Sequence, residues 1–230
     1  MGPFPSRGGG DLLGKYAGFV DYGFLDAAGA NALKRKKTHV KPDAAGCVAW
    51  LREMGGQLEG APTLLRVYWY DAEFEPSDAR YPSQRKYFDA IARTPGLQLR
   101  LGHLRESVPN WHYAMKKALE RHGIDPDEFE ERFSFRNVLS QKGVDTLITL
   151  DLVRLAQTNA YHTAILVAGD RDLAEPVRVA QDFGCRVLLA VPPKAGVAQE
   201  LRQVADAVFT IDDATLNRIL RVSEGSPAPA

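Results

Sequence analysis

Short apolar runs of strand-forming residues alternate with helix-like segments along this 230-residue chain, and this alternation limits the fold more than any other feature. The clearest runs are YAGFVD (16–21), TLLRVYWYD (63–71), HTAILVAGD (162–170), RVLLAV (186–191) and ADAVFTID (205–212). Several are apolar throughout, as are strands of a parallel sheet that is covered by helices on both faces. The pattern therefore predicts an α/β protein, with a three-layer α/β/α, Rossmann-type domain built on a mostly parallel sheet.

The segments between these runs have helical composition, at residues 25–36, 43–54, 84–93, 143–156 and from 214 to about 222. Residues 97–104 alternate like a partly exposed strand. Two further helical segments, 110–122 and 126–133, are expected to form an excursion from the core at about 107–141. Because a chain of this length needs only one core, we expect a single domain at 15–222 with flexible tails at 1–14 and 223–230.

The composition is that of an ordinary soluble protein, with 45% hydrophobic and 25% charged residues. No apolar run approaches the roughly 20 residues needed to cross a bilayer, so no membrane association is expected. Cys47 and Cys185 are far apart and form no CxxC pair. This cysteine usage favours a reducing, cytoplasmic location over a disulfide framework or a zinc site.

Positive and negative residues balance at 29 each, so the chain has no overall basic field that would attract nucleic acid. Any such binding must be local. The one basic cluster is LKRKKTHVK (33–41), in which Lys36 and Lys37 are our candidates for contacts with substrate phosphates. A solvated helix end is the commoner explanation of a charge run this short.

Acidic residues stand at the ends of separate predicted strands. Asp21 closes the first strand, Asp170 and Asp172 follow HTAILVAG, and Asp145 lies in QKGVDT at the start of a helix. Carboxyl ends of parallel strands converge where the strand order reverses, and crowded carboxylates are tolerated best when a divalent cation compensates their charge. Oxygen ligands alone favour Mg²⁺ or Mn²⁺. We therefore predict that these four acids hold a metal ion and support phosphodiester hydrolysis.

Each acid also has a structural alternative. Asp172 and Glu175 form a capping-box-like D-x-x-E pair, which makes capping and chemistry about equally supported for Asp172. Asp170 is harder to explain as a cap, because Pro176 would then lie inside the helix. Taken alone, Asp145 would merely favour its helix terminus, and Asp21 would simply end a strand.

Three other charged residues are expected to lie outside the metal site. Asp151 is six residues beyond Asp145, about 240° around a helix, and is expected on the surface or behind the site. Asp71 ends the run VYWYD and is expected at the periphery. Lys142, three residues before Asp145, is a candidate for neutralising a phosphate or an acid, although a lone lysine in a turn is usually solvated.

Several of these motifs together resemble the NYN domain family of PIN-like nucleases, specifically its LabA-like bacterial branch. They are FVDYGFL, VYWYDA, KGVD, AGDRD and ADAVFTID, in this order from about Tyr16 to Asp212. The resemblance implies a PIN-like fold that binds Mg²⁺ or Mn²⁺ and cleaves RNA. It assigns the metal to Asp21, Asp145, Asp170 and Asp172, and Lys142 matches the lysine of the helix-opening motif.

The chain departs from that family at two places. Many relatives have an asparagine or another polar residue just after the first acid, whereas this chain continues with Tyr22, Gly23, Phe24 and Leu25. The polar contact made there is expected to be absent. The GDSD-like turn of the family is GDRD here, so Arg171 is expected to touch a substrate phosphate or to narrow the entrance.

The leading hypothesis from the sequence is a metal-dependent ribonuclease with RNA as its partner, and a homodimer is one assembly that the sequence allows. A noncatalytic RNA-binding or regulatory module that keeps the NYN fold is the alternative. A third class comprises Toprim-type nucleases and phosphatases of the haloacid dehalogenase type. Toprim domains need a glutamate on an earlier strand and these phosphatases need Asp-x-Asp after the first strand, and Asp21-Tyr22-Gly23 supplies neither.

Overall fold

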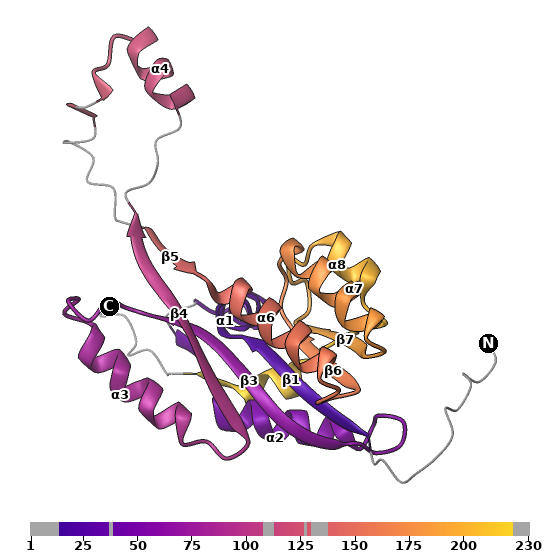
Figure 1. Ribbon diagram of the computed structural model, residues 1–230. Coiled ribbons are helices and arrows are strands. Elements are labelled where there is room, and N and C mark those ends of the chain that lie inside the picture. Colours follow the sequence, from indigo (N-terminus) through magenta and orange to yellow (C-terminus); the bar gives the residue numbers. More distant parts are fainter. Residues whose placement is uncertain (1–13, 37–38, 108–112, 127, 130–137, 223–230) are drawn as a thin grey trace.

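A seven-stranded sheet forms the centre of the protein, in a computed structural model that describes residues 14–36, 39–107, 113–126, 128–129 and 138–222 (Figure 1). Its strand order is β5-β4-β3-β1-β6-β7-β8. All neighbouring strands run parallel except β4 and β5, which are antiparallel. The strands are β1 (Lys15–Asp21), β3 (Thr63–Glu73), β4 (Leu97–Ser107), β5 (Val138–Lys142), β6 (Thr163–Val167), β7 (Arg186–Val191) and β8 (Ala207–Thr210).

Helices cover both faces of this sheet and enclose two apolar cores (Figure 1). One core packs against α2 (Ala44–Gly55), α3 (Tyr81–Ala92) and α9 (Asp213–Ile219), and the other against α6 (Val144–Gln157), α7 (Ala174–Asp182) and α8 (Gln199–Val204). Residues of α1 (Tyr22–Ala32) contribute to both cores. The expected three-layer α/β/α architecture with a mostly parallel sheet is therefore confirmed.

The central strands are buried because their side chains are apolar on both faces. In β1 the five residues from Tyr16 to Val20 are all buried. Gly18 of this strand lies against Leu51 of α2, and a β-carbon at position 18 would stand only 2.6 Å from the Leu51 Cδ1 atom. This glycine lets α2 pack closely on the middle of the sheet.

Several boundaries differ from those expected. Helix α1 begins at Tyr22 because the side chain of Asp21 caps it, three residues before the expected start. Helix α3 begins at Tyr81, with a proline in its first turn. The final helix ends at Ile219, and the next three residues form β9 (Leu220–Val222), which pairs antiparallel with β2 (Val40–Pro42).

The predicted excursion is framed by strands at both ends. Strand β4 continues to Ser107 and β5 begins at Val138, so the two strands extend the sheet toward α4 (Tyr113–Arg121), which Figure 1 places beyond the end of β4. Helix α4 lies within the expected 110–122 segment. Most of the helix expected at 126–133 lies outside the described residues, as do both tails apart from Gly14.

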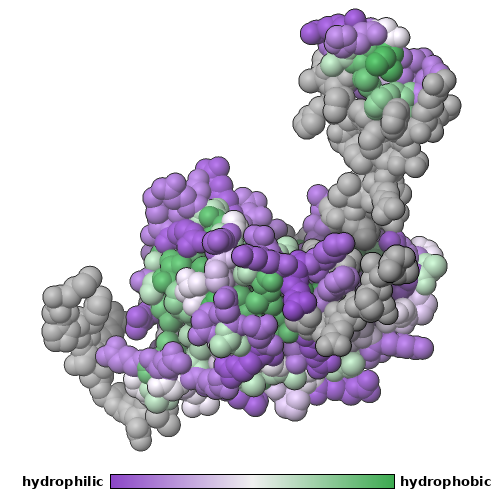
Figure 2. Space-filling model, turned by 180° about the vertical axis from the view of Figure 1, so that it is seen from behind, coloured by the Kyte–Doolittle hydropathy of each residue, from purple (hydrophilic) through white to green (hydrophobic). Residues whose placement is uncertain are grey.

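Hydrophilic side chains dominate the face seen from behind, with an apolar area across the middle of the body (Figure 2). None of the helices in the described ranges has both the length and the apolar character that crossing a membrane requires.

Candidate active site

Asp21 lies where the order of the strands reverses. Strand β1 stands between β3 and β6, and Asp21 is its last residue. The carboxylate is partly buried and accepts a hydrogen bond from the Phe24 N–H over 3.1 Å, which caps α1. Burial raises the pKa of Asp21 to about 6; the Phe24 N–H opposes this increase, and the charges of Asp145 and Asp170 add to it.

Asp170 follows β6 at the same edge of the sheet. Before it stands Gly169, where a β-carbon would lie 2.5 Å from the Cε2 atom of Phe24, so a glycine lets this loop approach α1. The Asp170 side chain accepts the Asp172 N–H over 3.0 Å and caps a short 3₁₀ helix, η2 (Arg171–Leu173). The close approach of this loop to α1 and the cap of η2 together keep Asp170 near Asp21.

This geometry corrects the expectation that Asp170 is hard to explain as a cap. The 3₁₀ helix is a separate turn, and α7 begins only at Ala174, so Pro176 lies in the first turn of α7. The alternative of a capping box at Asp172 is not found, because the N-cap of α7 is Leu173 and no side chain caps it. Glu175 instead pairs with Arg178 over 3.1 Å.

Asp145 approaches the same place from the start of α6. The preceding Gly143 has a φ of 82°, a left-handed conformation that favours glycine, and it turns the chain from β5 into the helix. Asp145 lies in the first helical turn and is partly buried. Burial raises the pKa of its carboxyl, and the charges of Asp170 and Asp172 raise it further.

The structure thus brings the four predicted acids near one another from three separate segments of the chain. Asp21 and Asp145 have raised pKa values in part because of the neighbouring carboxylates. Asp170 and Asp172 are exposed and lie on the solvent side of this acidic centre. Crowding of this kind costs free energy that protons or a cation can offset.

The donor chemistry of the acidic centre fits Mg²⁺ or Mn²⁺, since it consists of carboxylate oxygens without histidine or cysteine. As the side chains stand, however, no three His, Cys, Asp or Glu residues of the described segments are placed to hold one ion. Asp21 and Asp170 each use a carboxylate oxygen to cap the helix that follows. Coordination would therefore need the carboxylates to turn toward a common point.

Of the four basic residues predicted to bind substrate, the three that the structure describes lie in different parts of it. Lys142 is exposed at the end of β5, two residues before α6. Arg171 lies between Asp170 and Asp172, and its Nε atom pairs with the Glu200 carboxylate over 3.1 Å. Lys36 is exposed after α1, and Lys37 lies outside the described residues.

Asp71 lies deeper and nearer to the acidic centre than the sequence suggested. Its side chain is only 5% exposed, and burial raises its pKa to about 7, with further contributions from the charges of Asp21 and Asp26. Lys41, from the predicted basic cluster, acts against this increase. The sequence analysis did not single out Asp26. This aspartate is the one charged residue of YGFLDAAGANA, the segment that forms α1, and that isolation is the signal that could have identified it.

Of the two placements expected for Asp151, on the surface or behind the site, the surface placement is wrong. This carboxylate is 6% exposed and accepts two hydrogen bonds from Arg100 of β4, over 2.7 and 3.1 Å. The Tyr70 hydroxyl donates a third over 3.2 Å. Asp151 therefore links α6 to the sheet, and the prediction that it does not share the face of Asp145 is consistent with this placement.

An α/β/α sheet whose carboxyl edge gathers aspartates at the strand reversal has the arrangement of a PIN-like domain. The family model described as "NYN domain" matches residues 51–213, and the chain belongs to this family. The family is part of the PIN-like nuclease superfamily. The matched range contains Asp145, Asp170 and Asp172, while Asp21 precedes it.

The chain also resembles individual proteins. An uncharacterized protein y4oD from Sinorhizobium fredii is 39% identical over 99 residues, which is 42% of this chain and 46% of that protein. The chain thus matches less than half the length of this relative. A protein of unknown function, VPA0982 from Vibrio parahaemolyticus, has a crystal structure that superposes with a TM-score of 0.54. That match covers 92% of this chain and 99% of the other at 19% identity, and it shows the fold alone.

Proposed function

We propose that this protein is a metal-dependent ribonuclease that hydrolyses phosphodiester bonds of RNA. The observation that supports the proposal is that burial and the charges of Asp145 and Asp170, which come from other segments of the chain, raise the pKa of Asp21 to about 6 at the strand reversal. A raised pKa at a ligand-binding edge is typical of functional sites, because a purely structural carboxylate gains nothing from repulsion. Membership in the NYN domain family supports the same chemistry.

Asp21, Asp145, Asp170 and Asp172 would hold Mg²⁺ or Mn²⁺ in this site. A bound cation of this kind supplies charge stabilisation at the phosphoryl group and lowers the pKa of water. Asp21 Oδ1 stays engaged with the Phe24 N–H, so the cap of α1 fixes where its other oxygen can reach. The caps at Asp21 and Asp170 therefore limit how each carboxylate can turn toward a bound cation.

Two basic side chains border the acids and are suited to the phosphates of a bound strand. Lys142 precedes α6, and Arg171 stands between two of the acids. Arg171 is paired with Glu200 in a largely exposed ion pair, with side-chain exposures of 72% and 45%. Because exposed pairs contribute little stability, a phosphate can replace Glu200 as the partner of Arg171 at small cost.

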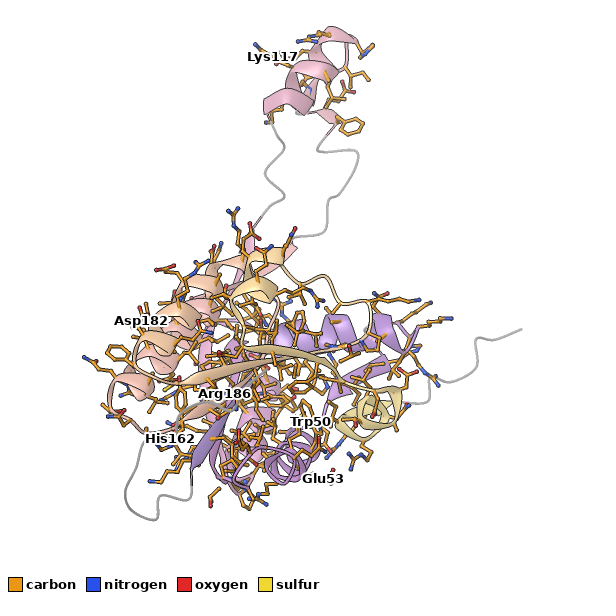
Figure 3. All side chains as sticks on the ribbon, turned by 90° about the vertical axis from the view of Figure 1, so that its right-hand side faces the viewer. Trp50, Glu53, Lys117, His162, Asp182 and Arg186 are labelled. Atoms are coloured by element: carbon orange, nitrogen blue, oxygen red, sulfur yellow. The ribbon has the colours of Figure 1, made fainter. Side chains whose placement is uncertain are left out.

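The test is cleavage of a 5′-labelled RNA by the purified full chain with and without MgCl₂ or MnCl₂. The Asp21→Asn and Asp145→Asn chains should each lose activity by about 100-fold, because they lose a metal-binding charge. Asp182→Asn is the matched control, since this exposed aspartate ends α7 at the opposite end from Asp170. Figure 3 labels Asp182 on the outer helical layer. Cleavage that persists in both site variants would contradict the proposal.

A noncatalytic RNA-binding module is the second candidate, and one residue favours it. Tyr22 follows the first acid and packs against Trp69 with ring centroids 5.9 Å apart, so an aromatic ring stands where many relatives have an asparagine. Titration with MnCl₂ separates the two functions. RNA binding without any change of melting temperature in MnCl₂ would favour the binding module.

A further inference from the structure

A pocket of about 1120 Å³ lies beside the acidic centre, between α1, the end of β3 and α3. Its wall includes Tyr22 and Gly23, which directly follow Asp21 in the chain. Asp71 of β3 lines it from the sheet side. Because consecutive Cα atoms are about 3.8 Å apart, the pocket begins one residue away from a predicted metal ligand. A group bound here would therefore be a direct neighbour of a phosphate at the acids.

Aromatic rings and a stacked guanidinium form the walls of this pocket. Tyr22 of α1 and Tyr87 of α3 both line it, and burial raises the pKa of both hydroxyls. Phe74 and Arg80 lie in the connection from β3 to α3, with the Arg80 guanidinium 4.0 Å from the centroid of the Phe74 ring. Rings and guanidinium planes are the surfaces on which unpaired bases stack.

The polar groups of the pocket suit the edge of a base better than a phosphate. Asp26 and Asp71 place acidic side chains in its wall, and these oppose the attraction that Lys41 and Arg80 would exert on a phosphate. Gln141 of β5 is exposed and reaches Asp71, with 3.5 Å between its Nε2 atom and the Asp71 Oδ1 atom. Amide and carboxyl groups of this kind can pair with the donors and acceptors of a base edge.

One wall of the pocket is held in place before any ligand binds. Gln84 of α3 accepts the Phe74 N–H over 2.8 Å and donates to the Ala72 carbonyl over 3.1 Å. These two hydrogen bonds tie α3 to the end of β3. The position of Phe74 relative to α3 is therefore set by the fold. A ligand that binds there loses less free energy to the ordering of this wall.

A second, smaller cavity continues from the first along α3. It measures about 300 Å³ and shares Lys41 and Tyr87 with the larger pocket. It is also lined by Arg221, which is the cross-strand partner of Lys41 and pairs with Asp43 over 2.9 Å. Two neighbouring cationic side chains thus line the smaller cavity, and they would attract a phosphate of a strand bound in the larger pocket.

We infer that the larger pocket binds one unpaired nucleobase of an RNA strand, next to the phosphate that the acids engage. The inference rests on the proposed function and adds to it the substrate class: single-stranded RNA. A paired base could enter only after leaving its helix, which costs a few kcal/mol for each base pair. Single strands are therefore selected over duplexes at this site.

The test compares binding of a short labelled single-stranded RNA with binding of the same sequence as a blunt duplex, by fluorescence anisotropy. Full-length chain with Asp21→Asn is used so that cleavage does not interfere. The single strand should bind at least about ten-fold more tightly, and Tyr87→Ala should weaken its binding by about ten-fold, since stacking of one base contributes about 1–3 kcal/mol. Tyr87→Phe keeps the ring and should stay within about two-fold.

Phe183→Ala is the matched control, because this ring is 42% exposed, close to the 39% of Tyr87, and lies at the end of α7 that leads into the start of β7. It should leave binding unchanged. Arg80→Gln serves as a second pocket variant and should also weaken binding of the single strand.

Failure of the inference and failure of the proposed function give different results. Equal affinity for single strand and duplex, with no effect of Tyr87→Ala or Arg80→Gln, would overturn the inference, even in a chain that cleaves RNA. Binding of neither RNA would overturn it as well. If the wild-type chain fails to cleave in MnCl₂ while Tyr87→Ala and Arg80→Gln still weaken single-strand binding, the ribonuclease proposal fails and the pocket assignment stands.

Discussion

The Asp170 carboxylate accepts a hydrogen bond from the backbone N–H of Asp172 over 3.0 Å. One predicted metal ligand, Asp170, therefore orients the turn that carries another, Asp172. The cap belongs to η2, which precedes α7. Capping needs only an oxygen acceptor, whereas binding of a divalent cation needs the charge. The two roles of Asp170 can therefore be separated by substitution.

Asp170→Asn should keep the stability of the protein and lose its activity. An asparagine side chain caps about as well as an aspartate, so the free energy of unfolding should change little. Asp170→Ala removes both roles and should lower the free energy of unfolding by about 1 kcal/mol. Urea denaturation and RNA cleavage, measured side by side on both chains, check this. Full activity in Asp170→Asn would mean that this carboxylate only caps η2.

Asp71 should make the metal-free protein less stable as the pH rises. Its pKa is about 7 in the folded protein, against an ordinary value of 3.8. The folded state therefore holds a proton that the unfolded chain has released, and this stabilisation is complete below about pH 4 and lost as the pH rises through about 7. Asp21, with a pKa of about 6, contributes in the same direction.

The measurement is urea denaturation in EDTA between about pH 5 and pH 8, with wild type and Asp71→Asn compared. The asparagine can still accept the Ala72 N–H, which Asp71 accepts over 2.7 Å, but it cannot ionise. The free energy of unfolding of the variant should fall less steeply with pH than that of the wild type. Because one pKa unit corresponds to about 1.4 kcal/mol, the variant should be more stable at about pH 8, on the order of a few kcal/mol. Identical slopes would contradict the buried placement of Asp71.

Continuous apolar runs predicted the buried strands well, because β1, β6 and β7 are covered on both faces and need apolar side chains throughout. The three-residue strands β2 and β9 were not predicted. They pair with each other across most of the length of the chain, and a pairing of this kind leaves almost no local pattern. Strand β5 was missed for a related reason, since it forms by pairing with β4 at the edge of the sheet.

The four acids could be predicted because their sequence positions, at strand ends and a helix start, already determine the edge of the sheet where they lie. The burial of Asp71 could not be predicted from the sequence. Strand β3 continues two residues past it to Glu73, and Asp71 points to the same face as the buried Trp69, two residues earlier. A strand boundary misplaced by two residues was enough to make a buried carboxyl look peripheral.

Manganese should stabilise the protein more at high pH than at low pH. Carboxylates must lose their protons to bind a metal, and Asp21 with a pKa of about 6 is largely protonated at about pH 5. A saturating ion at 100 times its dissociation constant adds about 2.7 kcal/mol, or several degrees of melting temperature. The shift should therefore be large at about pH 8 and small at about pH 5.

Thermal unfolding with MnCl₂ or EDTA, followed by circular dichroism, measures this shift. Asp145→Asn should abolish most of it, and Asp182→Asn should keep it, since Asp182 ends α7 away from the acids. In Figure 3, Asp182 lies on the same side as His162 and Arg186, which stand at the starts of β6 and β7. A shift of equal size in all three chains would show that the ion binds elsewhere.

Removing the carboxylate of Asp151 should destabilise the protein without affecting the chemistry. Arg100 has a side-chain exposure of 27% and depends on Asp151 for two hydrogen bonds, so Asp151→Asn leaves a half-buried cation without its charge partner. Removing one partner of a fully buried ion pair lowers the free energy of unfolding by about 3–5 kcal/mol. Because Arg100 is only partly buried, the loss in Asp151→Asn should be close to the lower end of this range.

A matched control lies one turn away on the same helix. Arg154 also pairs with Asp151, over 3.2 Å, but its side chain is 63% exposed, so Arg154→Ala should cost less than about 1 kcal/mol. The double change Asp151→Leu with Arg100→Met removes both charges and should recover much of the stability lost in Asp151→Asn. Urea denaturation gives all three values. If cleavage per folded molecule fell in Asp151→Asn as it does in Asp145→Asn, Asp151 would have to act in the site, and its assignment as a link between α6 and the sheet would be wrong.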